Sequence, residues 1–219
     1  MALKTILGYK IFTMNKVCTL KVTAIAFDLG NVLVRVDHGR FCRALAELAG
    51  RSADEVFAAT FASDLEPAFD TGGLTPEEFY RRVMARLAAA VPYPLFCRLW
   101  NEIFDPMDGM EEVVAHLGAR YRLFMLSNTN ALHYPYIREN FPIVRHFPQP
   151  VLSFEVGSRK PEAGIFQALV ARAGEAPERI LFVDDKLIFV EAARAQGLCA
   201  WQFVSPAELK RQMSRHGLW

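Results

Sequence analysis

Residues 22–32 read Val-Thr-Ala-Ile-Ala-Phe-Asp-Leu-Gly-Asn-Val, and this stretch decides the fold. Its first six residues are mostly apolar and do not alternate with polar ones, which is typical of a strand covered on both faces. Asp28 stands where this strand ends. Four further apolar runs lie at residues 123–126, 151–154, 180–183 and 198–204. We therefore predict five strands in one parallel sheet.

Helical signals separate these apolar runs. Residues 110–117 place apolar side chains at helical spacing, with Asp108 as the expected N-cap. Pro161 is expected to open a second helix that ends near Gly174, and Gly197 is expected to end a third. Because strands alternate with helices, the sequence predicts an α/β fold with a central parallel sheet.

Residues 37–106 interrupt this alternation. They contain no convincing strand, but Phe41, Leu45 and Leu48 trace one helical face, and Thr75 begins another helix with a capping box. We predict a small helical bundle inserted after the first strand. The expected organisation is an N-terminal extension over 1–20, a first core segment over 21–36, a helical cap over 37–107 and a second core segment over 108–219.

The composition argues against several classes of protein. The 219 residues carry 25 Lys and Arg against 24 Asp and Glu, a balance that argues against nucleic-acid binding. No stretch offers about 20 uninterrupted apolar residues, so we predict no membrane span. The four cysteines form no Cys-x-x-Cys pair, so we expect reduced cysteines in a cytoplasmic protein. The sequence leaves open a monomer or a homodimer, and a translation start at Met1 or Met14.

Polar side chains stand where the predicted strands end or where a predicted helix begins. They are Asp28, Ser127, Asn128, Lys160, Asp184 and Asp185. In an open α/β sheet, ligands bind beyond the carboxyl ends of the strands, so we expect these groups to converge. Three carboxylates suit Mg²⁺, which prefers oxygen ligands. Together with a lysine, a hydroxyl and backbone N–H groups, they form a cradle for a phosphoryl group, which an aspartate can attack.

Four motifs in this order resemble those of the haloacid dehalogenase (HAD) superfamily. An apolar strand ends in Asp at 24–28, a Ser follows a strand at 126–129, a Lys precedes Pro at 159–162, and an acidic pair follows a strand at 182–185. The resemblance spans residues 21–204. It implies a Rossmann-like three-layer core with an inserted helical-bundle cap, and Mg²⁺-dependent hydrolysis of a small phosphorylated metabolite.

The resemblance also implies a role for each matching residue. Asp28 resembles the nucleophile, which forms an aspartyl-phosphate and also binds the metal. The catalytic residues would be Asp28, Ser127 and Lys160. The phosphate-binding residues would be Ser127, Asn128 (through its N–H) and Lys160. The metal ligands would be Asp28, Gly30 (through its carbonyl), Asp184 and Asp185.

Within the superfamily, the chain resembles phosphatases of the α-D-glucose-1-phosphate type and the N-terminal phosphatase domain of soluble epoxide hydrolase, which makes a sugar phosphate a candidate substrate. Two positions depart from the usual pattern. Gly30 stands where most of these phosphatases carry a second aspartate as general acid, and Phe189 stands where Asp or Asn is usual. Asn31, a water on the metal and a cap residue are the candidates to replace the missing acid.

Two other functions stay open. A hydrolytic dehalogenase also lacks the second aspartate, although the acidic pair at 184–185 and the dipeptide at 30–31 favour phosphate and metal. A non-catalytic HAD-like protein that binds a phosphorylated ligand would account for Gly30 and Phe189. Halide release without metal would favour the first function, and tight binding of a sugar phosphate without turnover would favour the second.

Overall fold

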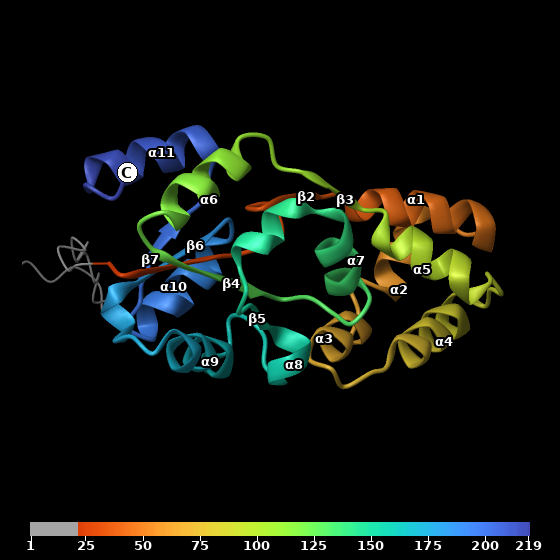
Figure 1. The fold of residues 1–219 in the computed structure, drawn as a ribbon. Coiled ribbons are helices and arrows are strands. Elements are labelled where there is room, and N and C mark those ends of the chain that lie inside the picture. The colour runs from red at the N-terminus through yellow and green to blue at the C-terminus, as the bar shows by residue number, and fades with distance from the viewer. Residues whose placement is uncertain (1–21) are drawn as a thin grey trace, which may run out of the picture.

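A five-stranded parallel sheet forms the centre of the protein, and the computed structural model describes residues 22–219 (Figure 1). The strand bounds are Ala24–Phe27 (β1), Arg122–Ser127 (β4), Val151–Leu152 (β5), Ile180–Asp184 (β6) and Cys199–Gln202 (β7). The strands stand in the order β5-β4-β1-β6-β7, and every neighbouring pair is parallel. The predicted α/β fold with a central parallel sheet is therefore confirmed.

The register of the strands brings three polar residues to one edge of the sheet. Phe27, the last residue of β1, lies opposite Met125 of β4 and Val183 of β6. Asp28 and Asp184 follow Phe27 and Val183 directly, and Ser127 ends β4. Since the three strands run in the same direction, these polar side chains emerge side by side at their carboxyl ends.

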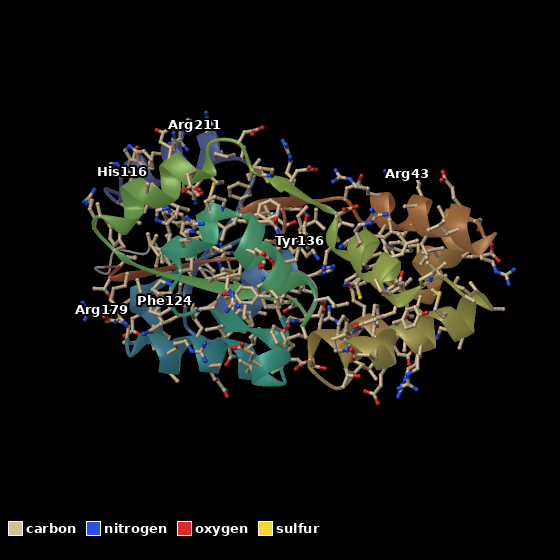
Figure 2. The ribbon with its side chains drawn as sticks, turned by 45° about the vertical axis from the view of Figure 1, so that its right-hand side comes forward. Arg43, His116, Phe124, Tyr136, Arg179 and Arg211 are labelled. Carbon is tan, nitrogen blue, oxygen red and sulfur yellow. The ribbon has the colours of Figure 1, made fainter. Side chains whose placement is uncertain are left out.

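Successive side chains of the strands point to opposite layers of helices. Ile25 and Phe27 belong to the hydrophobic cluster that includes α6 and α11, whereas Ala24 and Ala26 belong to the cluster of α9 and α10. The helix bounds are Met110–Gly118 (α6), Ala163–Ala173 (α9), Leu187–Ala195 (α10) and Pro206–Arg215 (α11). Figure 1 shows α6 and α11 above the sheet and α9 and α10 below it, which gives a three-layer core. His116 of α6 and Arg211 of α11 mark the outer side of the upper layer (Figure 2).

Five helices between the first strand and the rest of the core form a separate bundle, at the right of Figure 1. Their bounds are His38–Ala49 (α1), Ala53–Ala59 (α2), Leu65–Asp70 (α3), Pro76–Leu87 (α4) and Tyr93–Asn101 (α5). They enclose their own hydrophobic cluster, in which Phe41 and Phe96 pack around the buried Trp100. The predicted inserted helical bundle is confirmed. Leu48 was expected on its buried face, but this side chain lies in the last turn of α1 and is 52% exposed.

A short antiparallel ribbon of two strands joins this bundle to the core. We call the bundle the cap and the ribbon the hinge. Val34–Val36 (β2) pairs with Phe104–Pro106 (β3), with Arg35 opposite Asp105. The prediction that 37–106 contains no strand is therefore wrong at its end. Three residues are too few to show a periodicity, and Pro106 disfavours a strand in sequence. Arg40 of α1 also pairs with Asp105 at 2.6 Å, beside this ribbon.

Several predicted helix boundaries change in the structure. Gly109, with φ of 86°, is the N-cap of α6, and Asp108 pairs with Arg35 instead of capping the helix. Pro161 does not open α9, which begins at Ala163 after a cis peptide bond between residues 160 and 161. The capping box at Thr75 and the left-handed glycines at 174 and 197 are confirmed.

The remaining elements are short connections. They are His133–Asn140 (α7), Ser153–Val156 (α8) and two 3₁₀ helices, Pro142–His146 and Pro177–Arg179. Because α8 begins at Ser153, the strand predicted over 151–154 is two residues too long. In the part of the chain that the structure describes, no helix has the length and apolar character needed to cross a membrane.

The cysteine prediction is confirmed for two residues and wrong for a third. Cys42 and Cys97 are free thiols, whereas Cys199 is disulfide-bonded. Cys18, both methionines considered as a translation start, and the extension predicted over 1–20 lie outside the described residues.

Candidate active site

Three carboxylates meet at the carboxyl edge of the sheet. Asp28 follows β1, Asp184 ends β6 and Asp185 comes next in the chain. Each offers an oxygen atom, and these atoms lie within 4.8 Å of one another. Asp28 and Asp184 are both buried. Carboxylates this close repel one another unless a positive charge lies between them.

Lys160 supplies one such charge from the loop before α9. Its Nζ atom lies 2.7 Å from Oδ1 of Asp28 and 2.6 Å from Oδ2 of Asp184, and its side chain is only 1% exposed. Burial alone would lower the pKa of Lys160, but the two carboxylates outweigh burial and raise that pKa above its usual value. Lys160 is therefore an ammonium ion held between two carboxylates.

For Asp28, burial outweighs the effect of the neighbouring charges on the pKa. Burial raises the pKa of Asp28 to about 7, and the ammonium of Lys160 only partly offsets this effect, while Asp184 adds to it. A further positive charge beside a buried carboxyl group with so high a pKa would stabilise its ionised form. The site therefore favours a cation near Asp28.

Asp185 has an oxygen with no partner, which also indicates a cation site. Its Oδ1 atom is buried and accepts no hydrogen bond from any residue in 22–219. Burial raises the pKa of Asp185, and the charge of Asp184 raises it further. An unpaired buried carboxylate oxygen is unfavourable unless a donor or a cation satisfies it. With the oxygens of Asp28 and Asp184 nearby, this donor set fits the predicted Mg²⁺.

Asn128 fixes the loop that follows β4 to the segment that carries Lys160. Its side-chain Oδ1 accepts a hydrogen bond from the backbone N–H of Lys160 at 2.8 Å, and its Nδ2 donates to the carbonyl of Lys160 at 3.0 Å. Ser127, directly before it, is buried and lines the same cavity as Asp28. This pair of hydrogen bonds holds the end of β4 and Lys160 in one fixed relation.

Gly30 lies where the absence of a side chain is structurally useful. A Cβ atom at this position would approach Cγ2 of Val36 to 3.3 Å, a tight contact with the hinge strand β2. The backbone of Gly30 also bridges to Val34 of the same strand. The position expected for a second aspartate therefore lies against the ribbon that carries the cap.

A cavity of about 150 Å³ collects all the residues predicted for the site except Asp184, which lies behind Lys160. The core lines it with Asp28, Gly30, Ser127, Asn128, Lys160 and Asp185. The cap lines it with His38, Glu66 and Asp70, and the hinge lines it with Phe104 of β3. The structure thus brings the predicted residues together, and their individual roles remain predictions.

Two cap carboxylates in this cavity were not singled out from the sequence. Glu66 and Asp70 lie one turn apart on α3 and both line the cavity. Burial raises the pKa of Glu66 to about 7, and the charge of Asp70 adds to this effect. Burial also raises the pKa of Asp70, to about 6, against the opposing charge of Arg159. No motif marks them, because a six-residue helix in the cap gives no sequence sign of where it faces.

Asp70 and the loop after β4 connect the cap to the core. Nδ2 of Asn130 donates to Oδ1 of Asp70 at 3.2 Å, and Arg159 lies 3.8 Å from the other oxygen of Asp70. His133 stacks on Trp100 of the cap and donates from Nε2 to the carbonyl of Trp100 at 2.9 Å. Burial lowers the pKa of His133 to about 3, so this imidazole is neutral.

Phe189 occupies the position where an Asp or Asn was expected. Its ring centroid lies 5.1 Å from Nζ of Lys160 and 5.3 Å from Nζ of Lys186. An aromatic face attracts a nearby ammonium ion through its quadrupole. Phe189 therefore contacts the same lysine that a polar residue would have approached, but through a different interaction.

The family of the chain follows from a match that covers most of it. A model of the haloacid dehalogenase-like hydrolases matches residues 22–197. The chain belongs to this family. The predicted superfamily and the predicted hydrolase are thereby confirmed. The residues of the four HAD motifs are those that meet at the carboxyl edge of the sheet described above.

A relative and a solved structure, both from Bacteroides thetaiotaomicron, are similar to the chain. The chain is 23% identical over 198 residues to a D-ribitol-5-phosphate phosphatase, a match that covers 87% of this chain and 96% of the relative. A HAD family enzyme solved in complex with magnesium and inorganic phosphate is 25% identical, with a TM-score of 0.76, and the match covers 84% of this chain and 95% of that one.

A dehalogenase of the same superfamily shares the fold at greater distance. The L-2-haloacid dehalogenase of Xanthobacter autotrophicus is 15% identical, with a TM-score of 0.64, and the match covers 90% of this chain and 84% of that one. At this identity the likeness shows the HAD fold alone.

Proposed function

We propose that the chain is a Mg²⁺-dependent phosphatase that hydrolyses a small phosphate monoester through an aspartyl-phosphate on Asp28. The observation that carries the proposal is the Lys160 ammonium, which lies between Asp28 and Asp184. It neutralises the nucleophile and one neighbouring carboxylate, and it leaves Asp185 with a buried oxygen that needs a cation. A dianionic phosphate group is accepted only by a site with such positive charge.

Mg²⁺ would be held by Asp28, the carbonyl of Gly30, Asp184 and Asp185. Bound Mg²⁺ supplies positive charge against the phosphate oxygens and against the carboxylate of Asp28. The chain itself supplies the rest of the cradle. Ser127 and the N–H of Asn128 would donate to the phosphate oxygens, and Lys160 would hold both the phosphate and Asp28.

Hydrolysis would proceed in two displacements at phosphorus. In the first, an oxygen of Asp28 forms a bond to phosphorus while the bond between phosphorus and the alcohol oxygen breaks, and that oxygen takes a proton as it leaves. In the second, water attacks phosphorus, inorganic phosphate leaves and the carboxylate of Asp28 is restored. Because Gly30 has no side chain, the proton comes from a water or from another side chain of the cavity.

The substrate class follows from the size of the cavity and from the relatives. A cavity of about 150 Å³ suits a small metabolite rather than a macromolecule. A relative is named D-ribitol-5-phosphate phosphatase, and a similar structure was solved with magnesium and inorganic phosphate. These facts support a polyol or sugar phosphate as the substrate. We also propose that the segment over 37–107 acts as the cap domain over a core built from 21–36 and 108–219.

The test is a phosphate-release assay with MgCl₂ over a panel of sugar phosphates, polyol phosphates and nucleotides. Wild-type protein should release phosphate, EDTA should abolish release, and Asp28→Asn should lower kcat by about 10⁴-fold or more. Asp108→Asn is the matched control, because Asp108 is an exposed aspartate whose ion pair within residues 22–219 is with Arg35. It should keep wild-type turnover.

Three results would contradict the proposal. Halide release from 2-haloacids without metal would identify a dehalogenase. Tight binding of a sugar phosphate without turnover would identify a non-catalytic binding protein. Full activity of Asp28→Asn would remove Asp28 from the role of nucleophile.

A further inference from the structure

Apart from Asp185 at the expected metal site, a second carboxylate in the active-site cavity, that of Glu66, has no protein partner among residues 22–219. Glu66 lines the cavity from the cap, and no residue of 22–219 gives its side chain a hydrogen bond or an ion pair. A half-buried carboxyl group that faces a cavity without a partner leaves its hydrogen-bonding capacity available to a ligand. Glu66 is therefore placed to contact whatever fills the cap side of the cavity.

Asp70, one turn away on the same helix, differs from Glu66 in this respect. Both of its oxygens are used, one by Asn130 and the other by Arg159, and only 5% of the residue is exposed. Asp70 thus belongs to the contact between cap and core. Its charge still acts on the cavity, because it helps to raise the pKa of Glu66.

The two ends of the cavity therefore have opposite character. The core end carries Lys160 and the expected metal, which suit the phosphoryl group. The cap end carries Glu66 beside Asp70, and His38 of α1 also lines the cavity. Arg159 and Lys186 are the positive groups that act on Glu66. A substrate whose phosphate lies at the core end must place its alcohol portion at the cap end.

The protonation of Glu66 fits a hydroxyl partner. Burial raises the pKa of Glu66 to about 7, so near neutral pH both the acid and the carboxylate form are populated. The acid form of Glu66 donates one hydrogen bond, and the carboxylate form accepts several. A hydroxyl group can accept from the first form and donate to the second. A substrate carboxylate at the same place would be repelled by the ionised form of Glu66, while Arg159, one of the two positive groups nearby, is already paired with Asp70.

We propose that Glu66 binds the hydroxyl groups of the alcohol portion and selects uncharged polyhydroxy monophosphates over phosphorylated acids. This inference rests on the proposed phosphatase function and assigns the residue that selects its substrate. Glu66 is then a specificity-determining residue, not a member of the phosphoryl-transfer machinery around Asp28.

The experiment compares two substrates that differ at one terminal carbon. D-ribitol 5-phosphate ends in CH₂OH, and 5-phospho-D-ribonate ends in a carboxylate at the same carbon. p-Nitrophenyl phosphate serves as a third substrate, because its leaving group has no further hydroxyl and needs no proton. Wild-type protein, Glu66→Ala and Glu66→Gln are assayed, with Glu47→Gln as the control on an exposed cap glutamate outside the cavity.

Wild-type protein should prefer ribitol 5-phosphate over phosphoribonate by about 10-fold or more in kcat/KM. Glu66→Ala should raise KM for ribitol 5-phosphate by about 5- to 30-fold, with kcat nearly unchanged, and should leave p-nitrophenyl phosphate hydrolysis intact. Glu66→Gln keeps the shape of the side chain and loses its charge. It should reduce the preference for ribitol 5-phosphate over phosphoribonate, mainly by lowering KM for phosphoribonate. Glu47→Gln should behave as wild type.

Other outcomes would overturn the inference. Equal activity of wild-type protein on the two matched substrates would show no selection by charge. A fall in kcat on both with unchanged KM, and with p-nitrophenyl phosphate retained, would make Glu66 the general acid instead. Equal losses on all three substrates in both variants would show a structural role. No release from any substrate by wild-type protein would overturn the proposed function together with this inference.

Discussion

The Nζ atom of Lys160 lies 2.7 Å from Oδ1 of Asp28, although 132 positions separate the two residues in the chain. Lys160 also bonds to Asp184, so one ammonium balances two buried carboxylates. The charge balance of the site therefore depends on the loop before α9 as much as on the strands.

Lys160→Met should abolish most of the turnover and destabilise the fold. Removing the ammonium leaves Asp28 and Asp184 buried and unpaired, which typically costs about 3–5 kcal/mol of unfolding free energy. We expect kcat to fall by about 100-fold or more, because the phosphate and the nucleophile lose the same neutralising charge. Urea denaturation and steady-state kinetics measure the two effects.

Lys210→Met is the control for this variant. Lys210 pairs with Glu112 at 2.8 Å near the surface, and such pairs contribute about 0–1 kcal/mol. An unfolding free energy and a kcat for Lys160→Met that match those of Lys210→Met would refute the role of Lys160.

Asp185→Asn should weaken the response to Mg²⁺. Oδ1 of Asp185 is the buried oxygen with no protein partner, so its charge is available to the cation. The Mg²⁺ concentration for half-maximal activity should rise about 10-fold or more. Mg²⁺ should also raise the Tm of the wild-type protein. At a Mg²⁺ concentration of 100 times its Kd, the gain in unfolding free energy is about 2.7 kcal/mol. The variant should gain much less.

Asp108→Asn again provides the comparison, since Asp108 is exposed and outside the cavity. Its Mg²⁺ titration should coincide with that of the wild type. If Asp185→Asn gave the same coincident titration, the metal site would have to be sought elsewhere.

Phe189→Leu should reduce catalysis without unfolding the protein. The substitution keeps an apolar side chain beside Lys160 and removes the aromatic face that lies 5.1 Å from Nζ. An ammonium–aromatic contact is worth about 0.5–2 kcal/mol, so kcat/KM should fall by about 2- to 30-fold. The same kinetics on Phe57→Leu, a partly exposed ring of the cap, should show no change. Unaltered kinetics in Phe189→Leu would mean that its ring does not position Lys160.

His133 should make the fold sensitive to acid. Its pKa is lowered to about 3 by burial, whereas the unfolded chain has the usual value near 6.5. Between these values the unfolded state binds the extra proton, so the stabilisation from neutral His133 is complete above pH 6.5 and declines as the pH falls towards 3. Thermal melts across this range measure the decline.

The matched variant for this pH series is His133→Phe, which keeps the ring that stacks on Trp100. It loses the hydrogen bonds of the imidazole, so it should be less stable than wild type at pH 8. The difference in unfolding free energy should shrink as the pH falls below 6.5. A difference that is constant with pH would show that His133 is not held neutral.

Much of the core was predictable from the sequence, for a physical reason. A strand covered on both faces needs a continuous apolar run, and the run at β1 is followed directly by Asp28. Since parallel strands end at one edge, the residues after β4 and β6 had to approach Asp28. The strand ends therefore predicted which core residues meet at this edge of the sheet, although not their distances.

The contacts between cap and core were not predictable in the same way. Glu66 and Asp70 become cavity residues only because α3 packs beside the loop of Arg159, a relation with no local signature. The partner of Asp108 turned out to be Arg35 on the hinge, not the helix that follows it. Long-range pairings of single side chains depend on the finished fold, and no local sequence pattern shows which residues will pair.

The hinge ribbon has a consequence for how this enzyme can diverge. Both passages of the chain between core and cap are hydrogen-bonded to each other in β2 and β3, and the cap keeps its own hydrophobic cluster. Substitutions in α1–α5 away from Asp70 and Trp100, whose contacts reach the core, should therefore leave β1 and its aspartate undisturbed. The cap can accumulate changes in its inner lining as an independent module, so descendants of one ancestor can acquire new substrates while retaining the same reaction.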